Sequence, residues 1–233
     1  MKSILNKLKI KDAEKKAAVL LKYMDGILEK NEHVNLTAIS DREEFIQKHF
    51  ADSLSCIGAE EFKEADSIID VGTGGGFPGI PLAVCFPEKE FFLVDSLAKR
   101  IHIIRELCVK LGIDNVTVVH GRAEALGRQE NLREDFDLCV SRAVARMSTL
   151  CEYCLPFVRE GGSFIAYKGP DCKLEIDDSL CAIGILGGRL DRIDRADSGS
   201  QGEYDHRLVF VKKIRPTPEE YPRRAGTPSK KPL

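Results

Sequence analysis

The sequence predicts an α/β protein with a mostly parallel, doubly wound sheet. From residue 67 onward, apolar β-branched runs alternate with segments of helical periodicity, and this alternation is typical of parallel strands joined by crossover helices. The first run, residues 68–71, breaks into a loop with four glycines in five positions and then enters an apolar segment. A strand, a tight loop and a helix in this order indicate that backbone N–H groups approach a small ligand there.

The first 60 residues are expected to form a helical appendage to that sheet. Apolar residues recur at helical spacing over residues 11–30 and again over residues 41–57. The second helix opens on a capping box, formed by Ser40 or Asp41 with Glu43 or Glu44. We therefore divide the chain into an N-terminal helical appendage, residues 1–60, and a larger ligand-binding domain with a basic C-terminal tail, residues 61–233.

Strands and helices then follow one another in order. The expected strands cover residues 67–71, 90–95, 116–120, 136–141 and 162–168, and the expected helices cover residues 78–86, 97–111 and 147–158. Two last apolar segments, residues 188–194 and 207–213, are separated by a polar run that contains glycine. They are expected to form an antiparallel hairpin whose tip, residues 195–206, is mobile.

The glycine loop and the acid that ends the second strand point to a cofactor that contains adenosine. Gly72, Gly74 and Gly76 allow positive φ and a close approach of the backbone to a ligand. Asp95 lies 19 residues after Gly76, close to where a doubly wound sheet places the acid that binds a nucleotide ribose.

Two cofactors fit this pattern, because residues 74–79 also match the dinucleotide motif G-x-G-x-x-G. Asp70 precedes the first glycine by two residues. An acid there suits the sulfonium and ammonium groups of S-adenosylmethionine better than the pyrophosphate of NAD(P). NAD(P) is one alternative, and a structural turn without a ligand is the other. Phe77, at the edge of the loop, either lies against the methionine part of the cofactor or packs under the helix.

The ends of later strands supply further candidate residues. Ala123 and Glu124 follow the third strand, where a doubly wound sheet borders the adenine pocket. Arg142 and Arg146 follow the fourth strand and would face the cleft, where the planar fork of Arg142 suits a cofactor carboxylate, a phosphate or a guanine edge. Lys168 ends the fifth strand on the same rim, either for a similar role or as a surface lysine without one.

Both ends of the chain are basic, although the formal net charge is −2. Residues 207–233 contain eight Lys or Arg against two Glu, and residues 2–30 contain eight Lys against four acids. A polyanion that touches both ends fits this distribution, and a solvated tail is the alternative. The candidate contacts in the tail are Arg223, Arg224, Lys230 and Lys231.

Composition and cysteine spacing bear on the remaining classes. No segment reaches the roughly 18 apolar residues of a membrane helix, and the N-terminus lacks the apolar core of a signal peptide, so a cytoplasmic protein is expected. Cys85, Cys108, Cys139 and Cys181 lie in apolar patterns and are expected to be reduced and buried. Cys151 and Cys154 have zinc-like spacing, but no second pair completes four ligands, so no metal is expected.

Read in order, the motifs resemble the bacterial small-subunit ribosomal RNA guanine-N7 methyltransferases, the glucose-inhibited division protein B family. These motifs are NLTAI at 35–39, DVGTGGGFPGIPLA at 70–83, VDSLAKR at 94–100, GRAE at 121–124, SRAVA at 141–145, KG at 168–169 and TPEEYPRRAGTPSKKPL at 217–233. The resemblance spans nearly the whole chain. It implies a class I, Rossmann-like methyltransferase fold and a target guanine in 16S ribosomal RNA. It also implies cofactor contacts at Gly72, Phe77, Ala123, Glu124 and Arg142.

The residues agree with that chemistry. Guanine N7 attacks through an in-plane lone pair and loses no proton, so the reaction needs alignment and electrostatics but no general base. After the fourth strand the chain has Ser141-Arg142-Ala143-Val144 in place of the Asn/Asp-Pro-Pro-Tyr run of exocyclic amine methylation. We therefore expect no catalytic base and a positioning role for Arg142. The histidines expected to be structural or surface residues are His49, His102, His120 and His206.

Two other functions are considered beside this one. An NAD-dependent oxidoreductase would need a Tyr-x-x-x-Lys or similar constellation, which the sequence lacks. A non-catalytic RNA-binding protein would need the basic ends but neither the glycine loop nor Asp95. The expected partners are S-adenosylmethionine and 16S ribosomal RNA or the small ribosomal subunit, with no membrane, and the protein is expected to act as a monomer.

Overall fold

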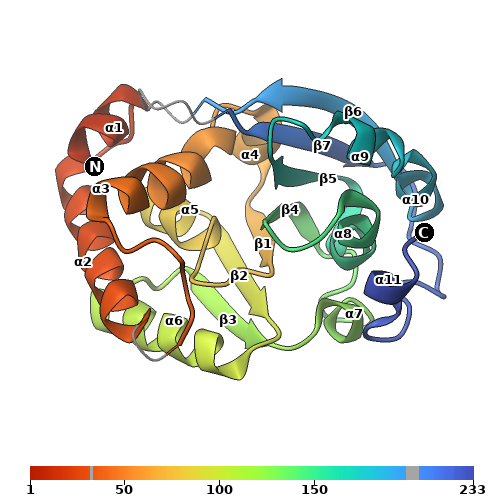
Figure 1. Ribbon diagram of the computed structural model, residues 1–233, viewed down its shortest axis with the longest axis horizontal. Coiled ribbons are helices and arrows are strands. Elements are labelled where there is room, and N and C mark those ends of the chain that lie inside the picture. Colours follow the sequence, from red (N-terminus) through yellow and green to blue (C-terminus); the bar gives the residue numbers. More distant parts are fainter. Residues whose placement is uncertain (32–33, 198–204) are drawn as a thin grey trace.

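The computed structural model describes residues 1–31, 34–197 and 205–233 (Figure 1). In these residues seven strands form one sheet in the order β3-β2-β1-β4-β5-β7-β6. Five strands pair in parallel, namely β1 (Ser67–Val71), β2 (Glu90–Asp95), β3 (Val116–His120), β4 (Phe136–Arg142) and β5 (Val158–Lys168). β7 (Arg207–Lys213) and β6 (Gly188–Arg195) continue the sheet in antiparallel pairing. The predicted fold class, with its antiparallel C-terminal hairpin, is confirmed.

Helices cover both faces of the sheet. On one face lie α2 (Ala13–Asn31), α5 (Gly79–Cys85) and α6 (Ala98–Leu111), and on the other lie α8 (Met147–Cys154) and α10 (Leu180–Ile185) (Figure 1). Successive strand residues point to opposite faces, so Ile68 packs in the core with α2, α5 and α6, whereas Ile69 packs in the core with α8 and α10. Burial on both faces explains why these strands are apolar runs without polar alternation.

The strand order reverses between β1 and β4. In open α/β sheets a ligand crevice forms at such a switch point, outside the carboxyl ends of the strands. β1 ends at Val71 and runs into the glycine loop, and β4 ends at Arg142. The glycine loop and Arg142, both singled out as candidate site residues from the sequence, therefore face the same crevice.

The segment before β1 is helical, as expected, but less regular. α1 (Lys2–Lys7) precedes α2, and the helix expected at residues 41–57 is divided into α3 (Arg42–Phe45), a π-helical turn (Ile46–Ala51) and a 3₁₀ turn (Leu54–Cys56), followed by α4 (Glu60–Glu64). Asp41 caps α3, because its Oδ1 accepts the Glu44 N–H at 2.8 Å. These helices share an apolar core with the sheet, and the division at residue 60 stays a prediction.

Other elements differ from expectation in ways with a local cause. The helix expected at residues 147–158 ends at Cys154, because Pro156 lies in the following 3₁₀ turn (Leu155–Phe157) and cannot donate to a continued helix. β5 begins at Val158 and not at residue 162, since Val158 pairs with Phe136 beyond a register shift. The short helices α7 (Ala123–Leu126) and α9 (Lys173–Asp177) were not expected.

The chain after β7 packs back onto the protein. Arg128 Nε donates to the Pro222 carbonyl at 2.8 Å, and Arg133 Nη2 donates to the Thr217 carbonyl at 2.7 Å. The segment ends in α11 (Thr227–Lys230), which lies beside α7 and α8 (Figure 1). A strongly basic tail was expected to be either solvated or bound to RNA. The structure shows that much of it packs onto the protein, so a loosely solvated tail does not describe it, and its contact with RNA stays a prediction.

Three further expectations concern single segments. Most of the hairpin tip, at residues 198–204, lies outside the described residues. Cys181 was expected to be buried but is exposed on α10, whereas the other seven cysteines are buried. Within the described part of the chain, no helix combines the length and the apolar character needed to cross a membrane.

Candidate functional site

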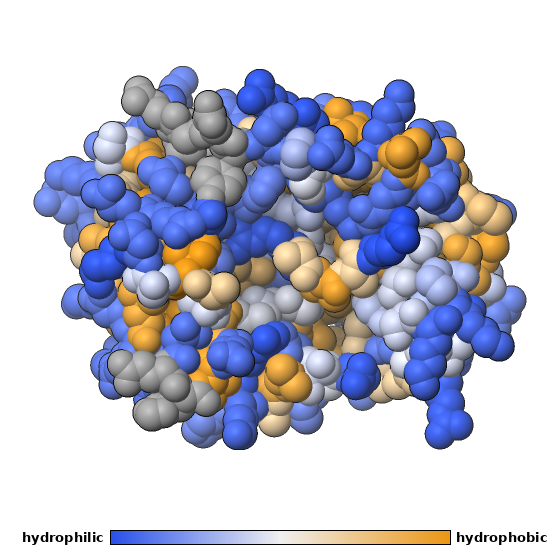
Figure 2. Space-filling view, viewed as in Figure 1, coloured by the Kyte–Doolittle hydropathy of each residue, from blue (hydrophilic) through white to orange (hydrophobic). Residues whose placement is uncertain are grey.

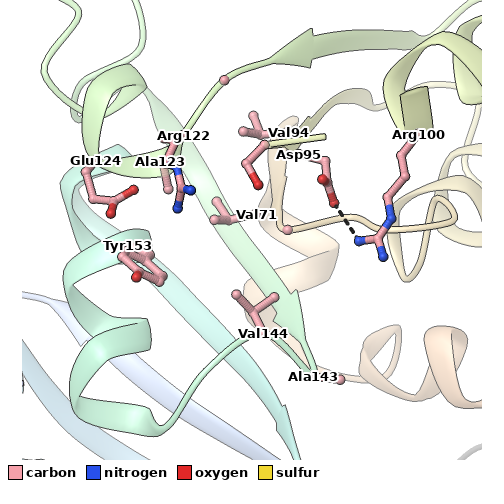
Figure 3. Close-up of a pocket in the computed structure, with 13 residues that line it drawn as sticks. Val71, Val94, Asp95, Arg100, Arg122, Ala123, Glu124, Ala143, Val144 and Tyr153 are labelled. Atoms are coloured by element: carbon pink, nitrogen blue, oxygen red, sulfur yellow. Dashed lines mark ion pairs between the residues drawn. The ribbon is translucent and has the colours of Figure 1, made fainter. Parts of the chain in front are cut away.

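Two adjoining cavities lie at the carboxyl ends of the parallel strands. The first, of about 330 Å³, is formed by the ends of β1, β2 and β3 and by the loop after β4 (Figure 3). The second, of about 480 Å³, lies between the glycine loop, the segment that follows α3 and the ends of β4 and β5. Gly72, Arg100 and Ala143 line both cavities, which therefore meet at the switch point. Figure 2 shows this face hollowed near its centre.

Asp70 shapes the glycine loop from beneath and lines neither cavity. Its side chain is fully buried, and its Oδ2 accepts hydrogen bonds from Thr73 Oγ1 at 2.7 Å and from the Gly79 N–H at 2.8 Å. Burial raises the pKa of Asp70 to about 6, although these hydrogen bonds act in the opposite direction. The expectation that Asp70 faces a cationic group of the ligand is therefore wrong. The Asp70 carboxylate instead joins the two ends of the glycine loop.

The three loop glycines with positive φ have different roles. Gly72 (φ +76°) and Gly74 (φ +60°) line the cavities, and the Gly74 N–H donates to Asp95 Oδ2 at 2.9 Å. Gly76 (φ +92°) lines neither cavity, and a Cβ there would lie 2.4 Å from Tyr23 Oη. Gly76 was expected to contact the cofactor. The close approach of Tyr23 indicates instead that Gly76 makes room for α2, which carries Tyr23.

Asp95 lies at the mouth of the first cavity, where an acid for a ribose was expected. Its Oδ1 accepts the Leu97 N–H at 2.8 Å, and its Oδ2 lies 3.5 Å from Arg100 Nη1 (Figure 3). Oδ1 keeps a second lone pair that can accept a ligand hydroxyl. Arg100, which the sequence analysis did not single out, has a buried Nε with no partner among the described residues. A buried donor without a partner is rare in folded proteins, which makes Arg100 a candidate residue of the site.

Replacing Asp95 with alanine is expected to weaken binding of S-adenosylmethionine by about 1.5–3 kcal/mol, because a charged acceptor for the ribose is lost. Isothermal titration calorimetry measures this change directly. Asp114→Ala removes an exposed acid between α6 and β3 and should leave the dissociation constant unchanged. A folded Asp95→Ala protein with wild-type affinity would exclude Asp95 from the site.

The far wall of the first cavity is built by α7 and α8. Ala123 and Glu124, which the sequence analysis named as candidates, lie in α7 and line this wall. Tyr153 of α8 lies on the same wall (Figure 3). Glu124 is buried, and its Oε1 accepts the Gly226 N–H at 2.8 Å, so the C-terminal segment fixes this carboxylate. The cavity also has apolar walls suited to a flat ring, supplied by Val71, Val94 and Val144.

Arg142 ends β4 and is held by the N-terminal helical segment. Its Nη1 donates to the Lys48 carbonyl at 2.9 Å and to Asp52 Oδ2 at 2.6 Å, and its Nη2 donates to His49 Nδ1 at 3.1 Å. A guanidinium has five N–H groups, so Nε–H and one N–H of Nη2 have no acceptor among the described residues. Because Arg142 lines the second cavity, these donors can meet an anionic or carbonyl oxygen of a ligand.

His49 is a neutral, fully engaged member of this cluster. Arg142 can only donate, so His49 Nδ1 accepts and its Nε2–H donates to Thr37 Oγ1 at 2.7 Å. Burial, together with the charge of Arg142, lowers the pKa of His49 to about 3. The ring stacks on Phe77 with centroids 4.4 Å apart and planes 7° apart. Phe77 thus packs under His49 and also lines the second cavity, while its contact with a cofactor stays a prediction.

His206 joins the cluster from the other side of Asp52. Its Nδ1 lies 2.7 Å from Asp52 Oδ1, and this hydrogen bond raises the pKa of His206 above its ordinary value. Burial alone would raise the pKa of Asp52, but the hydrogen bond from His206 and the charge of Arg142 lower it. His206 was expected to be structural or at the surface, and no sequence signal connects it with Asp52.

The ion pair of His206 with Asp52 is expected to make stability depend on pH. A raised folded-state pKa means that the stabilisation is complete below the ordinary histidine pKa of about 6.5 and is lost as pH rises through the folded-state pKa. Urea unfolding of the wild type and His206→Gln should therefore give a difference in unfolding free energy at pH 5.5 that shrinks at pH 9. A difference that is equal at both pH values would contradict this account.

Lys168 and Arg146 both lie on the rim of the crevice, but the first is held by other residues and the second is exposed. Lys168 Nζ donates to the Ala145 carbonyl at 2.8 Å and pairs with Glu175 Oε1 at 2.7 Å, so it holds the loop after β4. Arg146 begins α8 as its N-cap and is exposed. Only Arg146 of the two presents an exposed cationic side chain, and a direct RNA contact of Lys168 would require it to leave Glu175.

The basic residues of the C-terminal segment are also divided. Lys213 is fully buried and donates to carbonyls that include those of Leu155 and Val158, at 2.7 and 3.0 Å. Arg223 pairs with the buried carboxylate of Glu152, with Nη2 to Oε2 at 2.6 Å. The charge of the tail therefore overstates the surface available to a polyanion, because these side chains serve the fold. The predicted contacts that are exposed are Arg224, Lys230 and Lys231.

The sequence of this chain is similar to those of known methyltransferases. Residues 16–199 match the family model described as rRNA small subunit methyltransferase G. A relative from Alkaliphilus metalliredigens is 50% identical over 215 residues, which cover 92% of this chain and 89% of the relative, and one from Clostridium perfringens (strain 13 / Type A) is 47% identical over 220 residues, which cover 94% and 92%. Both are named ribosomal RNA small subunit methyltransferase G.

A solved structure supports the fold independently. The O-methyltransferase from Bacillus cereus, crystallised in complex with SAH, is 21% identical, covers 82% of this chain and 91% of its own, and superposes with a TM-score of 0.58. At that identity the likeness concerns the fold alone, which is the class I methyltransferase sheet that the motifs predicted. Given the family match and the two close relatives, the chain belongs to the glucose-inhibited division protein B family, the rRNA small subunit methyltransferases G.

Proposed function

We propose that this protein transfers the methyl group of S-adenosylmethionine to N7 of a guanine in 16S ribosomal RNA. The observation that carries the proposal is the meeting of the two cavities at Gly72 and Ala143. The first cavity has an acid suited to a ribose and apolar contacts from Val71, Val94 and Val144. The second has N–H donors of Arg142 that lack an acceptor among the described residues. A cofactor in the first would face a base in the second across the glycine loop.

The residues present fit the cofactor. A Cβ at Gly72 would lie 2.4 Å from Val144 Cγ2, so the backbone is bare where the cavities meet, and the buried Arg100 Nε awaits an acceptor. Asp95 would hold the ribose, and the Ala123–Glu124 turn would border the adenine. When bound, S-adenosylmethionine supplies an electrophilic methyl group and takes up the electron pair of the broken C–S bond.

The side chains of the second cavity suit a reaction without a general base. The guanine N7 lone pair forms the new N–C bond, no proton leaves, and the base becomes cationic. His49 is the nearest imidazole to Arg142, and both of its nitrogens are already engaged. Its pKa of about 3 also keeps it neutral. The contribution of the protein is therefore to orient the base through Arg142 and to exclude water.

Product mapping tests this function. Small ribosomal subunits that lack the modification are incubated with the protein and S-adenosylmethionine, and the RNA is then treated with borohydride and aniline, which cleave at 7-methylguanosine. We expect one new cleavage site in 16S ribosomal RNA and none in a reaction without S-adenosylmethionine. Methylation of an exocyclic amine or a ribose would overturn the mechanism, and a protein that prefers NAD(H) would overturn the function.

We further propose that the protein works as a monomer in the cytoplasm, where small subunits are assembled, and that both basic ends contact RNA phosphates. The N- and C-termini lie on opposite sides of the hollowed face (Figures 1 and 2), so an RNA that enters the crevice can reach both. In the C-terminal segment the proposal rests on Arg224, Lys230 and Lys231, which are exposed. Outside that segment it rests on Arg146, at the rim of the crevice.

Replacing Arg224, Lys230 and Lys231 together with alanine is expected to flatten the dependence of RNA affinity on salt. Each lost phosphate contact lowers the slope of log affinity against log salt by roughly 0.7 for single-stranded RNA, so the slope should fall by about 2. Filter binding over a range of potassium chloride concentrations measures it. Cofactor affinity should be unchanged in this variant, and an unchanged slope would remove the segment from the RNA interface.

A further inference from the structure

The N-terminal helical segment supplies an acid that faces the reaction site. Asp52 follows the π-helical turn, is only 2% exposed and lines the second cavity. Both of its oxygens are used: Oδ2 accepts from Arg142 Nη1 at 2.6 Å, and Oδ1 lies 2.7 Å from His206 Nδ1. These partners lie 90 and 154 residues away in sequence, so the contact exists only in the folded protein.

We propose that Asp52 is a positioning residue for methyl transfer, which acts by fixing the guanidinium of Arg142; this inference rests on the proposed function. An arginine side chain has four rotatable bonds and loses much freedom when it is held. Three acceptors on one short segment, residues 48–52, hold Arg142: the Lys48 carbonyl, His49 Nδ1 and Asp52 Oδ2. Asp52 is the charged one among them.

The three anchors leave a defined part of the guanidinium for the ligand. Both hydrogens of Nη1 are used by Lys48 and Asp52, and one of Nη2 is used by His49. Within the described part of the chain, Nε–H and the second hydrogen of Nη2 have no acceptor, so they are the donors with which Arg142 can bind a ligand oxygen. Without Asp52 the side chain could turn toward other acceptors, and a misplacement of about 1 Å can cost roughly 100-fold in rate.

A double-mutant cycle tests whether Asp52 acts through Arg142. With enzyme in excess over small ribosomal subunits and S-adenosylmethionine saturating, Asp52→Ala and Arg142→Ala should each lower the single-turnover rate constant about 100-fold. The Asp52→Ala/Arg142→Ala protein should fall no more than about threefold below Arg142→Ala, because the positioned group is already gone. As long as the folded enzyme stays in saturating excess, a fraction of unfolded protein changes neither the amplitude, which the limiting subunits set, nor the rate constant.

Two further variants separate positioning from general structure. Asp52→Asn keeps the shape and one oxygen acceptor, so it should retain a rate constant about 10-fold above that of Asp52→Ala, and it replaces Asp52→Ala in the cycle if the alanine protein fails to fold. Asp137→Ala is the matched control, because Asp137 also pairs with an arginine, Arg159 at 2.7 Å, but holds the start of β1 through the Ser67 N–H. Its rate constant should stay within about twofold of the wild type.

The outcomes distinguish this inference from the function on which it rests. If the wild type forms no 7-methylguanosine, the proposed function fails. If the wild type is active and Asp52→Ala has a normal rate constant, or lowers it by the same factor with and without Arg142, Asp52 does not position Arg142. Loss of rate in Asp52→Ala that vanishes in the Arg142→Ala background supports the inference.

Discussion

Replacing Arg223 with alanine is expected to lower the free energy of unfolding by about 3 kcal/mol. Glu152, its partner on α8, is completely buried, and Arg223 contacts both of its carboxylate oxygens. Truncation of Arg223 would leave a buried carboxylate without its cation, a change that typically costs about 3–5 kcal/mol. The lower end applies because the Arg223 side chain is 25% exposed and water can partly replace it.

The adjacent arginine provides the control. Arg224 is exposed, and its replacement with alanine should change the unfolding free energy by less than about 0.5 kcal/mol. Urea unfolding followed by circular dichroism compares the two variants at equal slope. Equal stability of the two would mean that the C-terminal segment does not depend on the pair with Glu152, and the Glu152→Gln/Arg223→Ala protein would show whether the loss comes from the unpaired charge.

The different environments of Arg223 and Arg224 could not be predicted from the sequence. Arg223 and Arg224 have the same charge, and counting charges assigned both to a polyanion. Only tertiary structure shows that one meets a buried carboxylate while the other faces solvent. Lys213 makes the same point, because a lysine in an apolar strand is found to satisfy carbonyl groups around the turn after α8.

The fold could be predicted from the sequence because apolar runs and helix caps are local features of the chain. The bounds of β1, β2 and β3 coincide with the predicted runs. β1 is buried along almost its whole length and needs unbroken apolar sequence, whereas β3 lies at the edge of the sheet and is only partly buried. The cap of α3 was narrowed to Ser40 or Asp41, and the structure shows Asp41, because a cap and its partner lie within one turn. The π-helical turn after α3 has no such signal, and two of its residues, Lys48 and His49, accept hydrogen bonds from the distant Arg142.

Residues of the candidate site could be predicted from the sequence where the sheet topology alone positions them. Asp95 and Arg142 end parallel strands and Glu124 follows one, and the carboxyl ends of such strands meet at one edge. Asp52 and His206 lie outside that rule, because they reach the crevice from the N-terminal segment and from the start of β7. Asp70 obeyed the rule and was still misread, because its carboxylate turns inward to the loop.

Gly72 offers the sharpest test of how the two cavities meet. Replacing Gly72 with alanine is expected to weaken binding of S-adenosylmethionine by about 30–100-fold. Gly72 has φ +76°, which strains a residue with a Cβ, and that Cβ would lie 2.4 Å from Val144 Cγ2. Strain of this kind costs roughly 1–3 kcal/mol, and overpacking adds to it. Because the free loop can relax away from the shape that the cofactor needs, this strain opposes binding.

Two companion variants separate backbone strain from the steric clash. Gly74→Ala carries only the strain, since Gly74 has φ +60° and the nearest atom to its added Cβ is 4.0 Å away, so its loss of affinity should be about 10-fold or less. Val144 also lines the first cavity, so Val144→Ala is measured alone as the reference. Relative to that reference, Gly72→Ala/Val144→Ala lacks the clash and should lose no more affinity than Gly74→Ala. If Val144→Ala brings no recovery, the loop after β4 does not press on Gly72, and the meeting of the two cavities is looser than the contact implies. If recovery is complete to the level of Val144→Ala alone, backbone strain at residue 72 contributes nothing to binding, and the glycine is needed only to make room for Val144.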